Sequence, residues 1–182
     1  MQPKLLGLTG RKQSGKDTAA AVMEGEKISF AAPIKLMLQA LLKYQGLDEV
    51  FIDRMLNGDL KETPSPYLAD QTPRYAMQRL GTEWGRQQMA DSLWVDIALE
   101  KAKKARRAVI TDVRFPNEVQ AIKDADGQVW RISRPGRPVG VGEEHSSEIL
   151  IDTLPVDKII TNDAPSAGAF RTKMAAIVTD TQ

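Results

Sequence analysis

The sequence contains no cysteine and only one histidine, His145. Disulfide bonds, thiolate catalysis and cysteine-based zinc sites are therefore excluded, and so is a metal site built from several histidines. Basic and acidic side chains nearly cancel, at 25 and 24, whereas a nucleic-acid or membrane surface normally needs an excess of Lys and Arg. The densest basic run, residues 101–107, is either a DNA-binding patch or a solvated helix end, and cations near a helix C-terminus favour the second interpretation.

Long apolar runs are also missing, because no stretch approaches the length needed to span a membrane. The N-terminal residues show no charged and apolar signal pattern. We therefore expect a cytoplasmic protein that acts on small molecules, without a nucleic-acid or membrane partner. The length of 182 residues predicts a single domain over residues 1–182.

Short apolar runs bounded by turn residues alternate with longer helical patterns along the chain, which is typical of an α/β fold with a parallel sheet. The expected strands are residues 5–9, 28–30, 108–111, 129–132 and 159–161. Helices are expected to begin at Pro73, after the capping Thr72, and at Leu93, after Ser92. Two others are expected over residues 116–127 and 164–178.

Two stretches rich in Pro, Gly and charge fit neither helical nor strand periodicity, at residues 57–71 and 135–144. In α/β enzymes such segments are loops or mobile lids. We therefore expect five parallel strands flanked by helices, with a short lid over the second stretch.

A glycine-rich segment directly follows the first expected strand. Residues 10–16 read G-x-x-x-x-G-K between an apolar run and a helical stretch, which is the context that a phosphate-binding loop (P-loop) requires. Its N–H groups can point at phosphate oxygens, and Lys16 supplies a cation for the β and γ phosphates. The plain alternative is a strand-to-helix turn with a surface lysine. The predicted phosphate-binding residues are Gly10, Lys12, Ser14, Gly15, Lys16, Asp17 and Thr18.

The residue after the lysine departs from the usual motif, because Asp17 stands where a hydroxyl residue is common and Thr18 comes one place later. Adenylate-kinase-like nucleotide kinases have a similar G-K-x-T order. Thr18 is therefore expected to bind phosphate or a metal-bound water, and Asp17 to act as a helix N-terminal anion or near the metal.

Five further segments follow the loop in a defined order: S-F-A-A-P-I-K at 29–35, Q-R-L-G-T-E-W-G-R at 78–86, T-D-V-R-F-P-N-E at 111–118, H-S-S-E at 145–148 and T-N-D at 161–163. Together with the loop they resemble the bacteriophage deoxynucleoside monophosphate kinase family over nearly the whole chain. The resemblance implies a P-loop kinase fold, ATP and Mg²⁺ on the donor side, and a deoxynucleoside monophosphate as acceptor. It also implies the host cytoplasm as location and leaves a homodimer open.

Asp112 stands at the end of the apolar run at residues 108–111. Its carboxylate should therefore emerge at the C-terminal edge of the sheet, where ligands of open α/β sheets bind. It would hold Mg²⁺ directly or through water, with Asp17 as the second candidate for the metal site. The plain alternative is an aspartate that caps a strand-to-loop turn.

Arginines outside the loop are candidates for the acceptor phosphate, since a guanidinium matches phosphate oxygens bidentately. Each of them has the alternative of a surface ion pair. The candidate acceptor-binding residues are Lys35, Arg79, Trp84, Arg86, Arg114 and Glu118. Trp84 has the further alternative of packing in the core.

Arg134 and Arg137 lie at and within the expected lid, from which similar kinases supply arginines to the transferred group. Arg134 is the better catalytic candidate, because strand alternation makes Arg131 structural. His145 is expected to be structural or associated with the lid. Asn162 either contacts the donor nucleotide or forms a turn before Pro165.

Two other functions remain open on the sequence alone. One is a P-loop kinase with another small acceptor, similar to dephospho-coenzyme A or phosphomevalonate. The other is a nucleotide-binding regulatory module without a second substrate. The extra arginines and the lack of an N-K-x-D guanine-binding segment argue against the regulatory module.

Overall fold

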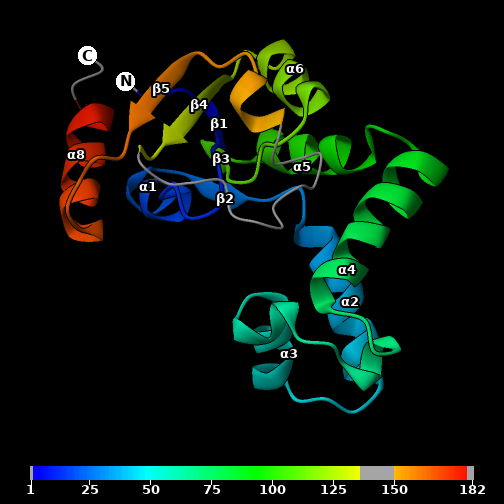
Figure 1. Cartoon of the computed structure of the whole chain (residues 1–182). Helices are drawn as coiled ribbons and strands as arrows, with labels where there is room; N and C mark the ends of the chain where they lie inside the picture. Colours follow the sequence, from blue (N-terminus) through cyan, green and yellow to red (C-terminus); the bar gives the residue numbers. More distant parts are fainter. Residues whose placement is uncertain (1, 136–149, 180–182) are drawn as a thin grey trace. The chain divides into compact units, whose positions relative to one another are not determined.

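Figure 1 shows the computed structural model, which describes residues 2–135 and 150–179. The chain forms two compact units. The first unit comprises Met1–Phe30 and Ile97–Gln182, and the second unit comprises Ala31–Asp96. The single domain expected over residues 1–182 stays a prediction, and each unit is described by itself.

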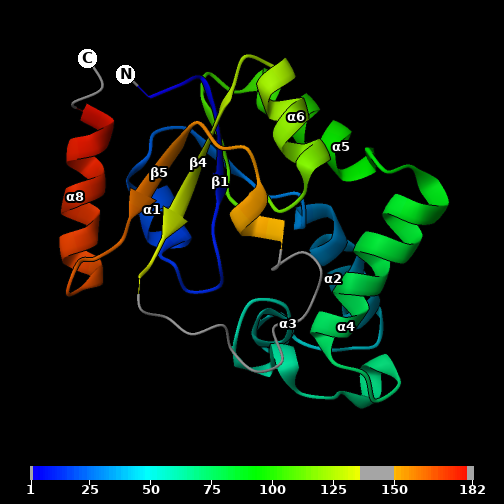
Figure 2. The ribbon, with the colours of Figure 1, turned by 45° about the horizontal axis from the view of Figure 1, so that its top comes forward.

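The described residues of the first unit contain five strands in one parallel sheet: β1 (Leu5–Thr9), β2 (Glu26–Ile28), β3 (Ala108–Ile110), β4 (Gln128–Ser133) and β5 (Lys158–Thr161). Their order is β2-β3-β1-β4-β5, so β1 lies in the middle (Figure 2). The predicted α/β class and five-stranded parallel sheet are confirmed.

The second expected strand was placed too late in the sequence. β2 begins at Glu26, which pairs with Ala108, and it ends at Ile28. Phe30 does not continue the ladder, because its N–H donates to the Asp112 carboxylate instead, at 2.9 Å.

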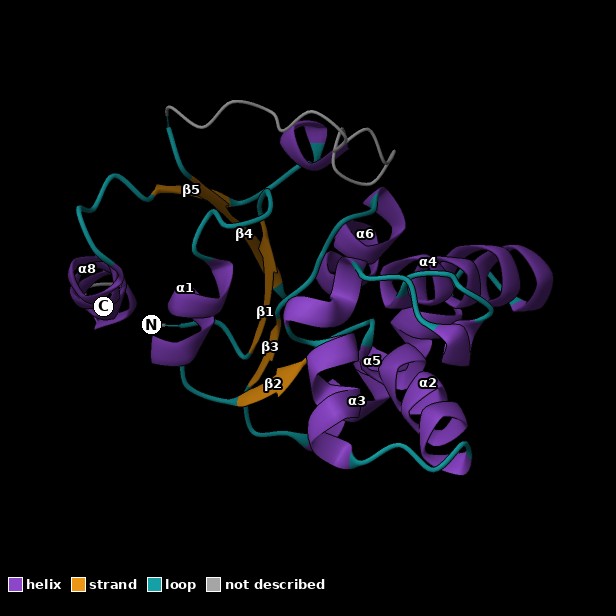
Figure 3. Ribbon diagram, turned by 60° about the horizontal axis from the view of Figure 1, so that its bottom comes forward, coloured by secondary structure: helices purple, strands orange, loops and turns teal. Residues whose placement is uncertain are grey.

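Helices cover both faces of this sheet. Figure 3 shows α1 (Lys16–Val22) and α8 (Ala167–Thr179) on one face and α6 (Pro116–Asp124) on the other. Leu6, Leu8, Trp130, Ile132, Phe170 and Met174 form the main buried cluster beneath α1 and α8. On the other face β1 approaches α6 closely at Gly7, where an added Cβ would lie 2.7 Å from Ile122 Cδ1.

The start of α8 also differs from the expected residue 164. The helix begins at Ala167, because the Ser166 hydroxyl accepts a hydrogen bond from the Ala169 N–H at 3.2 Å and so caps it. Pro165 directly precedes this cap. Among the described residues, no helix is both long and apolar enough to cross a membrane.

The second unit is helical, with α2 (Ala32–Tyr44), α3 (Glu49–Leu56) and α4 (Pro73–Gln78) around a core that contains Leu38, Leu42, Ile52, Met55 and Leu56. Thr72 caps α4 as expected, since its hydroxyl accepts from the Tyr75 N–H. The expected loop over residues 57–71 contains two 3₁₀ turns, Asp59–Glu62 and Pro66–Leu68.

The helix expected to begin at Pro73 changes from an α-helix to a π-helix after Gln78. After α4 the chain runs through a π-helix, Arg79–Met89, before α5 (Leu93–Lys104) begins. α5 has the predicted start at Leu93, and the division between the two units falls within it.

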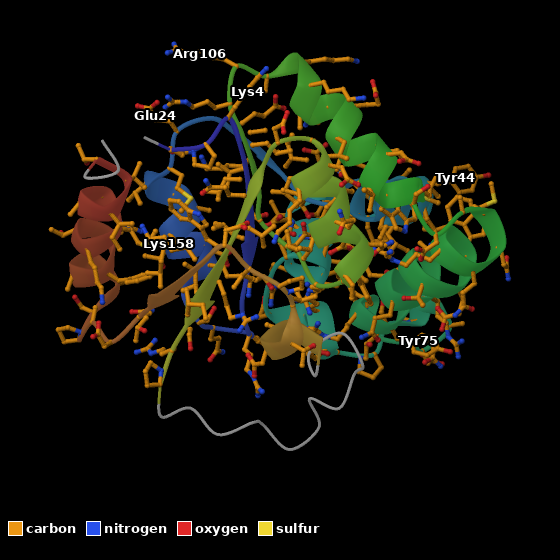
Figure 4. The ribbon with its side chains drawn as sticks, turned by 90° about the horizontal axis from the view of Figure 1, so that it is seen from above. Lys4, Glu24, Tyr44, Tyr75, Arg106 and Lys158 are labelled. Atoms are coloured by element: carbon orange, nitrogen blue, oxygen red, sulfur yellow. The ribbon has the colours of Figure 1, made fainter. Side chains whose placement is uncertain are left out.

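The basic run at residues 101–107 begins in the last turn of α5, and two of its members pair with carboxylates. Lys101 pairs with Glu26 at 3.0 Å, and Arg107 pairs with Glu24 at 2.5 Å. Figure 4 places Arg106 near Lys4 and Glu24, at the end of the first unit where β1 begins. These contacts favour the solvated helix end over a DNA-binding patch.

Candidate functional site

The loop between β1 and α1 depends on two glycines with positive φ, Gly10 at 145° and Gly15 at 105°. L-residues rarely adopt such angles. A Cβ at Gly10 would also overlap the carbonyl oxygen of Ile132, and one at Gly15 would lie 2.6 Å from Asn162 Nδ2. The loop therefore packs directly on its neighbours at both positions, which leaves no room for a side chain.

Lys16 is the first residue of α1, and its ammonium group turns back over the loop. Nζ donates to the carbonyl oxygens of Gly10 and Arg11, the latter at 3.0 Å. Ser14 is 3% exposed, and its hydroxyl has no hydrogen-bond partner among the described residues. The loop thus holds a cation over its own carbonyls and a buried hydroxyl available to an added acceptor or donor.

A cavity of about 240 Å³ adjoins the loop and α8. It brings together residues that the sequence placed far apart, among them Lys16, Arg134 and Asn162. Its lining residues are Gln13, Gly15, Lys16, Asp17, Thr18, Arg134, Asn162, Ala164, Ser166, Ala167 and Phe170. Two cations and one carboxylate line this cavity, which suits an anionic ligand.

Asn162 braces the loop from β5. Its side chain is 6% exposed, and Nδ2 donates to the Ser14 carbonyl at 2.8 Å. Its own N–H donates to the Ser133 carbonyl at 2.6 Å. Neither of the two roles expected for Asn162 included this contact with the loop.

The neighbour of Asn162 has a different environment. Asp163 accepts from Lys173 Nζ at 2.7 Å, and this hydrogen bond with the ammonium lowers the pKa of the Asp163 carboxyl. The pair is exposed, so it is worth little to stability.

Asp112 lies just beyond β3, at the C-terminal edge of the sheet, as predicted. Its two carboxylate oxygens accept from the Ser29 hydroxyl at 2.6 Å and from the Phe30 N–H at 2.9 Å. The carboxylate therefore joins the ends of β2 and β3, which is part of the plain alternative considered above.

The segment that carries Arg114 is held by Glu118. The Glu118 carboxylate is buried, and its Oε2 accepts from the N–H groups of Arg114 at 2.6 Å and Phe115 at 3.1 Å. This satisfies N–H groups ahead of α6 in the manner of a helix cap. Glu118 therefore supports the backbone of Arg114 through Oε2, and its expected contact with the substrate stays a prediction.

The second unit contains the other candidate substrate-binding residues. Lys35, in the first turn of α2, donates from Nζ to Asn57 Oδ1 at 2.6 Å. Arg79 donates to the Tyr75 hydroxyl at 3.0 Å and to Glu83 Oε1 at 2.9 Å. The bond with Tyr75, followed by the charge of Glu83, raises the pKa of Arg79.

Arg86 lies in the π-helix, and its side chain is only 10% exposed. Nη1 donates to the Asp91 carbonyl at 3.2 Å and lies 3.6 Å from the Asp91 carboxylate. Trp84 packs at 6.0 Å from Trp94, with the ring planes tilted by 43°. Lys35, Arg79, Trp84 and Arg86 thus share the second unit, whereas Arg114 and the loop belong to the first.

Several predicted residues stand apart from this geometry. Arg137, His145 and Glu148 lie outside the described residues. Arg131 is structural as expected, because Nη2 donates to the Leu154 carbonyl at 2.6 Å. In the described part of the chain, no three acidic or histidine side chains gather into a metal site. Asp17 and Asp112 therefore remain two separate candidates for contact with a metal ion.

Sequence reasoning missed two contacts around the site. Arg11, in the loop, donates from Nε and Nη2 to Asp152 Oδ2, at 2.9 and 2.5 Å. Trp94 donates from Nε1 to the Gly81 carbonyl at 2.8 Å. No periodicity or motif links Arg11 to a residue 141 positions away. The sequence around Trp94 indicated only a core position for this side chain.

Comparison with known proteins supports the same interpretation as the geometry of the cavity. Residues 68–171 match the family described as deoxynucleotide monophosphate kinase. A protein of Acanthamoeba polyphaga mimivirus, whose name assigns it to the deoxynucleotide monophosphate kinases, is 31% identical over 172 residues, which cover 82% of this chain and 83% of that protein.

A second relative matches over a shorter range. The deoxynucleoside-5'-monophosphate kinase of Escherichia phage T5 is 40% identical over 84 residues, which cover 42% of this chain and 34% of that protein. Among solved structures, dephospho-CoA kinase from Campylobacter jejuni aligns at 18% identity with a TM-score of 0.47, over 99% of this chain and 97% of that one. Likeness of this degree decides neither fold nor substrate.

The contact between Asn162 and the loop yields a stability prediction. Asn162→Ala should lower the free energy of unfolding by about 1–3 kcal/mol, because the buried Ser14 carbonyl loses its partner. Urea unfolding followed by circular dichroism measures this change. Asp163→Ala is the matched control and should change stability little, since its ion pair is exposed. Equal losses in the two variants would contradict the bracing role of Asn162.

Proposed function

The chain belongs to the deoxynucleotide monophosphate kinase family, and on this premise we propose that it transfers the γ-phosphoryl group of ATP to a deoxynucleoside monophosphate. The products are ADP and a deoxynucleoside diphosphate. The observation that carries the proposal is the cavity in which the loop, Lys16 and Arg134 meet. That cavity supplies the donor side of the reaction, and the arginines outside it supply the charge for a second anion.

On the donor side, Gly10, Lys12, Ser14, Gly15, Asp17 and Thr18 bind the triphosphate through the loop and the start of α1. Backbone N–H groups and the helix N-terminus favour negative charge there. Lys16 Nζ contacts two loop carbonyls, and phosphate oxygens would replace these weaker partners because charge-assisted hydrogen bonds are stronger. Asn162 keeps the loop backbone in place.

Mg²⁺ fits the residues at the sheet edge through one carboxylate, Asp112. The ion keeps several water ligands and is usually held by one or two carboxylates together with substrate phosphates. Because both Asp112 oxygens already accept hydrogen bonds, we propose contact through metal-bound water, with Asp17 as the second carboxylate near the phosphates. When bound, the ion neutralises charge on the β and γ oxygens.

On the acceptor side, we propose that Arg86 binds the phosphate of the monophosphate and that Lys35, Arg79 and Trp84, from the same unit, also contact the acceptor. Arg114, in the first unit, is a further candidate for this phosphate. This phosphate is already ionised near neutral pH, so transfer needs little help from a general base. Arg134 would stabilise the charge on the transferred group from the donor cavity. The family assignment disfavours both the other small acceptors and the regulatory module.

A cytoplasmic location fits a pair of small soluble substrates, and it stays a prediction together with the homodimer. The proposal needs no nucleic-acid or membrane partner.

The substrate class is tested by measuring ADP release over a panel of deoxynucleoside and nucleoside monophosphates. We expect release that depends on a deoxynucleoside monophosphate, and Lys16→Ala should lower turnover by about 10²-fold or more, as the loss of a phosphate contact does. The variant should keep its circular dichroism spectrum, because Lys16 fills no core position. Release that is independent of every monophosphate would contradict the proposed acceptor.

The role of Asp112 is tested by Asp112→Asn, which removes the charge and keeps groups able to bond Ser29 and the Phe30 N–H. We expect turnover to fall by about 10²-fold, with only partial recovery at raised Mg²⁺. Ser29→Ala is the control that removes one hydrogen bond and keeps the carboxylate. If Asp112→Asn behaves like Ser29→Ala, Asp112 is only a cap between strands.

Replacing different arginines should change different kinetic constants. Arg86→Ala and Arg114→Ala should raise the acceptor KM by about 10-fold or more and leave the KM for ATP nearly unchanged. Arg134→Ala should instead lower the single-turnover rate by about 10³-fold, because an arginine on the transferred phosphoryl group has that effect. An unchanged transfer rate in Arg134→Ala would exclude the proposed transition-state role.

A further inference from the structure

The π-helix Arg79–Met89 has an unusual length for its type. It comprises 11 residues, whereas π-helical geometry normally occurs as a single turn inserted in an α-helix, frequently at functional sites. Such a segment needs specific contacts to hold it, since the same residues could form α-helical hydrogen bonds. It also contains Arg86, and the helix type decides the direction in which that side chain leaves the axis.

The contacts that hold the π-helix come from Trp94, at the start of α5. The indole is 3% exposed, and its Nε1–H donates to the Gly81 carbonyl at 2.8 Å. In an α-helix this carbonyl would accept from the N–H of Gly85, four residues later. The indole therefore binds the Gly81 carbonyl, which accepts from residue 85 in an α-helix and from residue 86 in a π-helix.

Gly85 makes the same contact possible from the other side. An added Cβ would lie 2.5 Å from Trp94 Cε2 and 2.5 Å from Nε1. These neighbours belong to a rigid, buried ring rather than to the end of a flexible chain. Any side chain at Gly85 must therefore displace either the indole or the helix, and the glycine is needed for close approach.

Arg86 directly follows Gly85, and both ends of its side chain are fixed. The helix backbone sets its base, and Asp91 holds its guanidinium through the carbonyl at 3.2 Å and the carboxylate at 3.6 Å. Its 10% exposure leaves little freedom for another rotamer. A change of helix type at Gly81–Gly85 would therefore move the guanidinium away from its present position.

We propose that Trp94 and Gly85 are positioning residues that hold the π-helix in the register required for Arg86 to bind the acceptor phosphate. This inference rests on the proposed function, because it assigns Arg86 to the acceptor. Trp94 itself touches no substrate in this account. The competing explanation is that Trp94 is a core residue whose loss lowers stability and leaves the two substrates equally affected.

The test uses Trp94→Phe, which keeps an aromatic ring and removes the indole N–H, together with Gly85→Ala and the double variant. Trp94→Phe should raise the acceptor KM by about 10-fold and change the KM for ATP less than about twofold. Gly85→Ala should have the same selectivity. The double variant should be less impaired than the product of the single effects, because the smaller Phe ring leaves room for the added methyl group.

Trp130→Phe is the matched control in the first unit, since it also removes a buried indole hydrogen bond, from Nε1 to Gln128 Oε1 at 3.0 Å. It should lower stability without a selective change in the acceptor KM. If Gly85→Ala does not fold, Trp94→Phe and a ¹H–¹⁵N spectrum of the wild type still decide. The Trp94 indole signal, identified by its loss in Trp94→Phe, should shift when the monophosphate is added and stay in place with ATP.

The outcomes separate the two proposals. A wild-type protein that phosphorylates no deoxynucleoside monophosphate would overturn the proposed function. An active wild type whose acceptor KM is unchanged in Trp94→Phe would overturn the positioning role alone. The same conclusion follows if Trp130→Phe gives the same selectivity, or if the Trp94 indole signal does not respond to the monophosphate.

Discussion

The hydrogen bond from the Asn162 side chain to the Ser14 carbonyl joins the end of β5 to the phosphate-binding loop after β1. This contact matters because the two glycines of the loop, Gly10 and Gly15, have no side chains that could anchor it. Gly10 and Gly15 give the backbone its tight course, but glycine also has the most conformational freedom to lose on folding. Neighbouring strands limit this freedom, because Asn162 donates a hydrogen bond to the Ser14 carbonyl and Ile132 packs closely against Gly10.

The charges around this loop contribute little to the stability of the fold. Ion pairs such as Arg11–Asp152 are substantially exposed, and exposed pairs contribute little to folding. They can still fix the direction of a side chain, because Arg11 donates from two nitrogens to one oxygen. Lys16 and Arg134 face a cavity, where an anionic ligand offers stronger partners than water or a carbonyl.

The second unit shows a different way to fix functional side chains. Local propensity does not favour its π-helix, since the segment contains Gly81 and Gly85. Under the proposal above, the packing of Trp94 at Gly85 holds it instead. Glycine in a helix interior is unfavourable by about 1 kcal/mol relative to alanine. A sequence that retains it at Gly85 therefore has a packing reason, and the Trp94 ring supplies that reason.

The sequence by itself determined the strand order along the chain, the loop and its lysine, and the edge position of Asp112. These follow from local rules: alternation and apolar runs predict strands, and a parallel sheet brings the C-terminal ends of its strands to one edge. It also located the starts of α4, α5 and α6, because the capping Thr72 and a proline at the first helical position are local signals. It gave no sign of α2 and α3. The boundary at Phe30 moved because of a tertiary contact with Asp112, whereas the start of α8 moved because of the local cap at Ser166.

Only the tertiary structure decided which partner each polar group takes. Asn162 bonds Ser14, Arg11 bonds Asp152, and Trp94 bonds Gly81. The first of these contacts spans 148 positions, and none leaves a periodic trace in the sequence. The type of the helix at Arg79–Met89 also appeared only in the tertiary structure, because α-helical and π-helical hydrogen bonding suit the same residues.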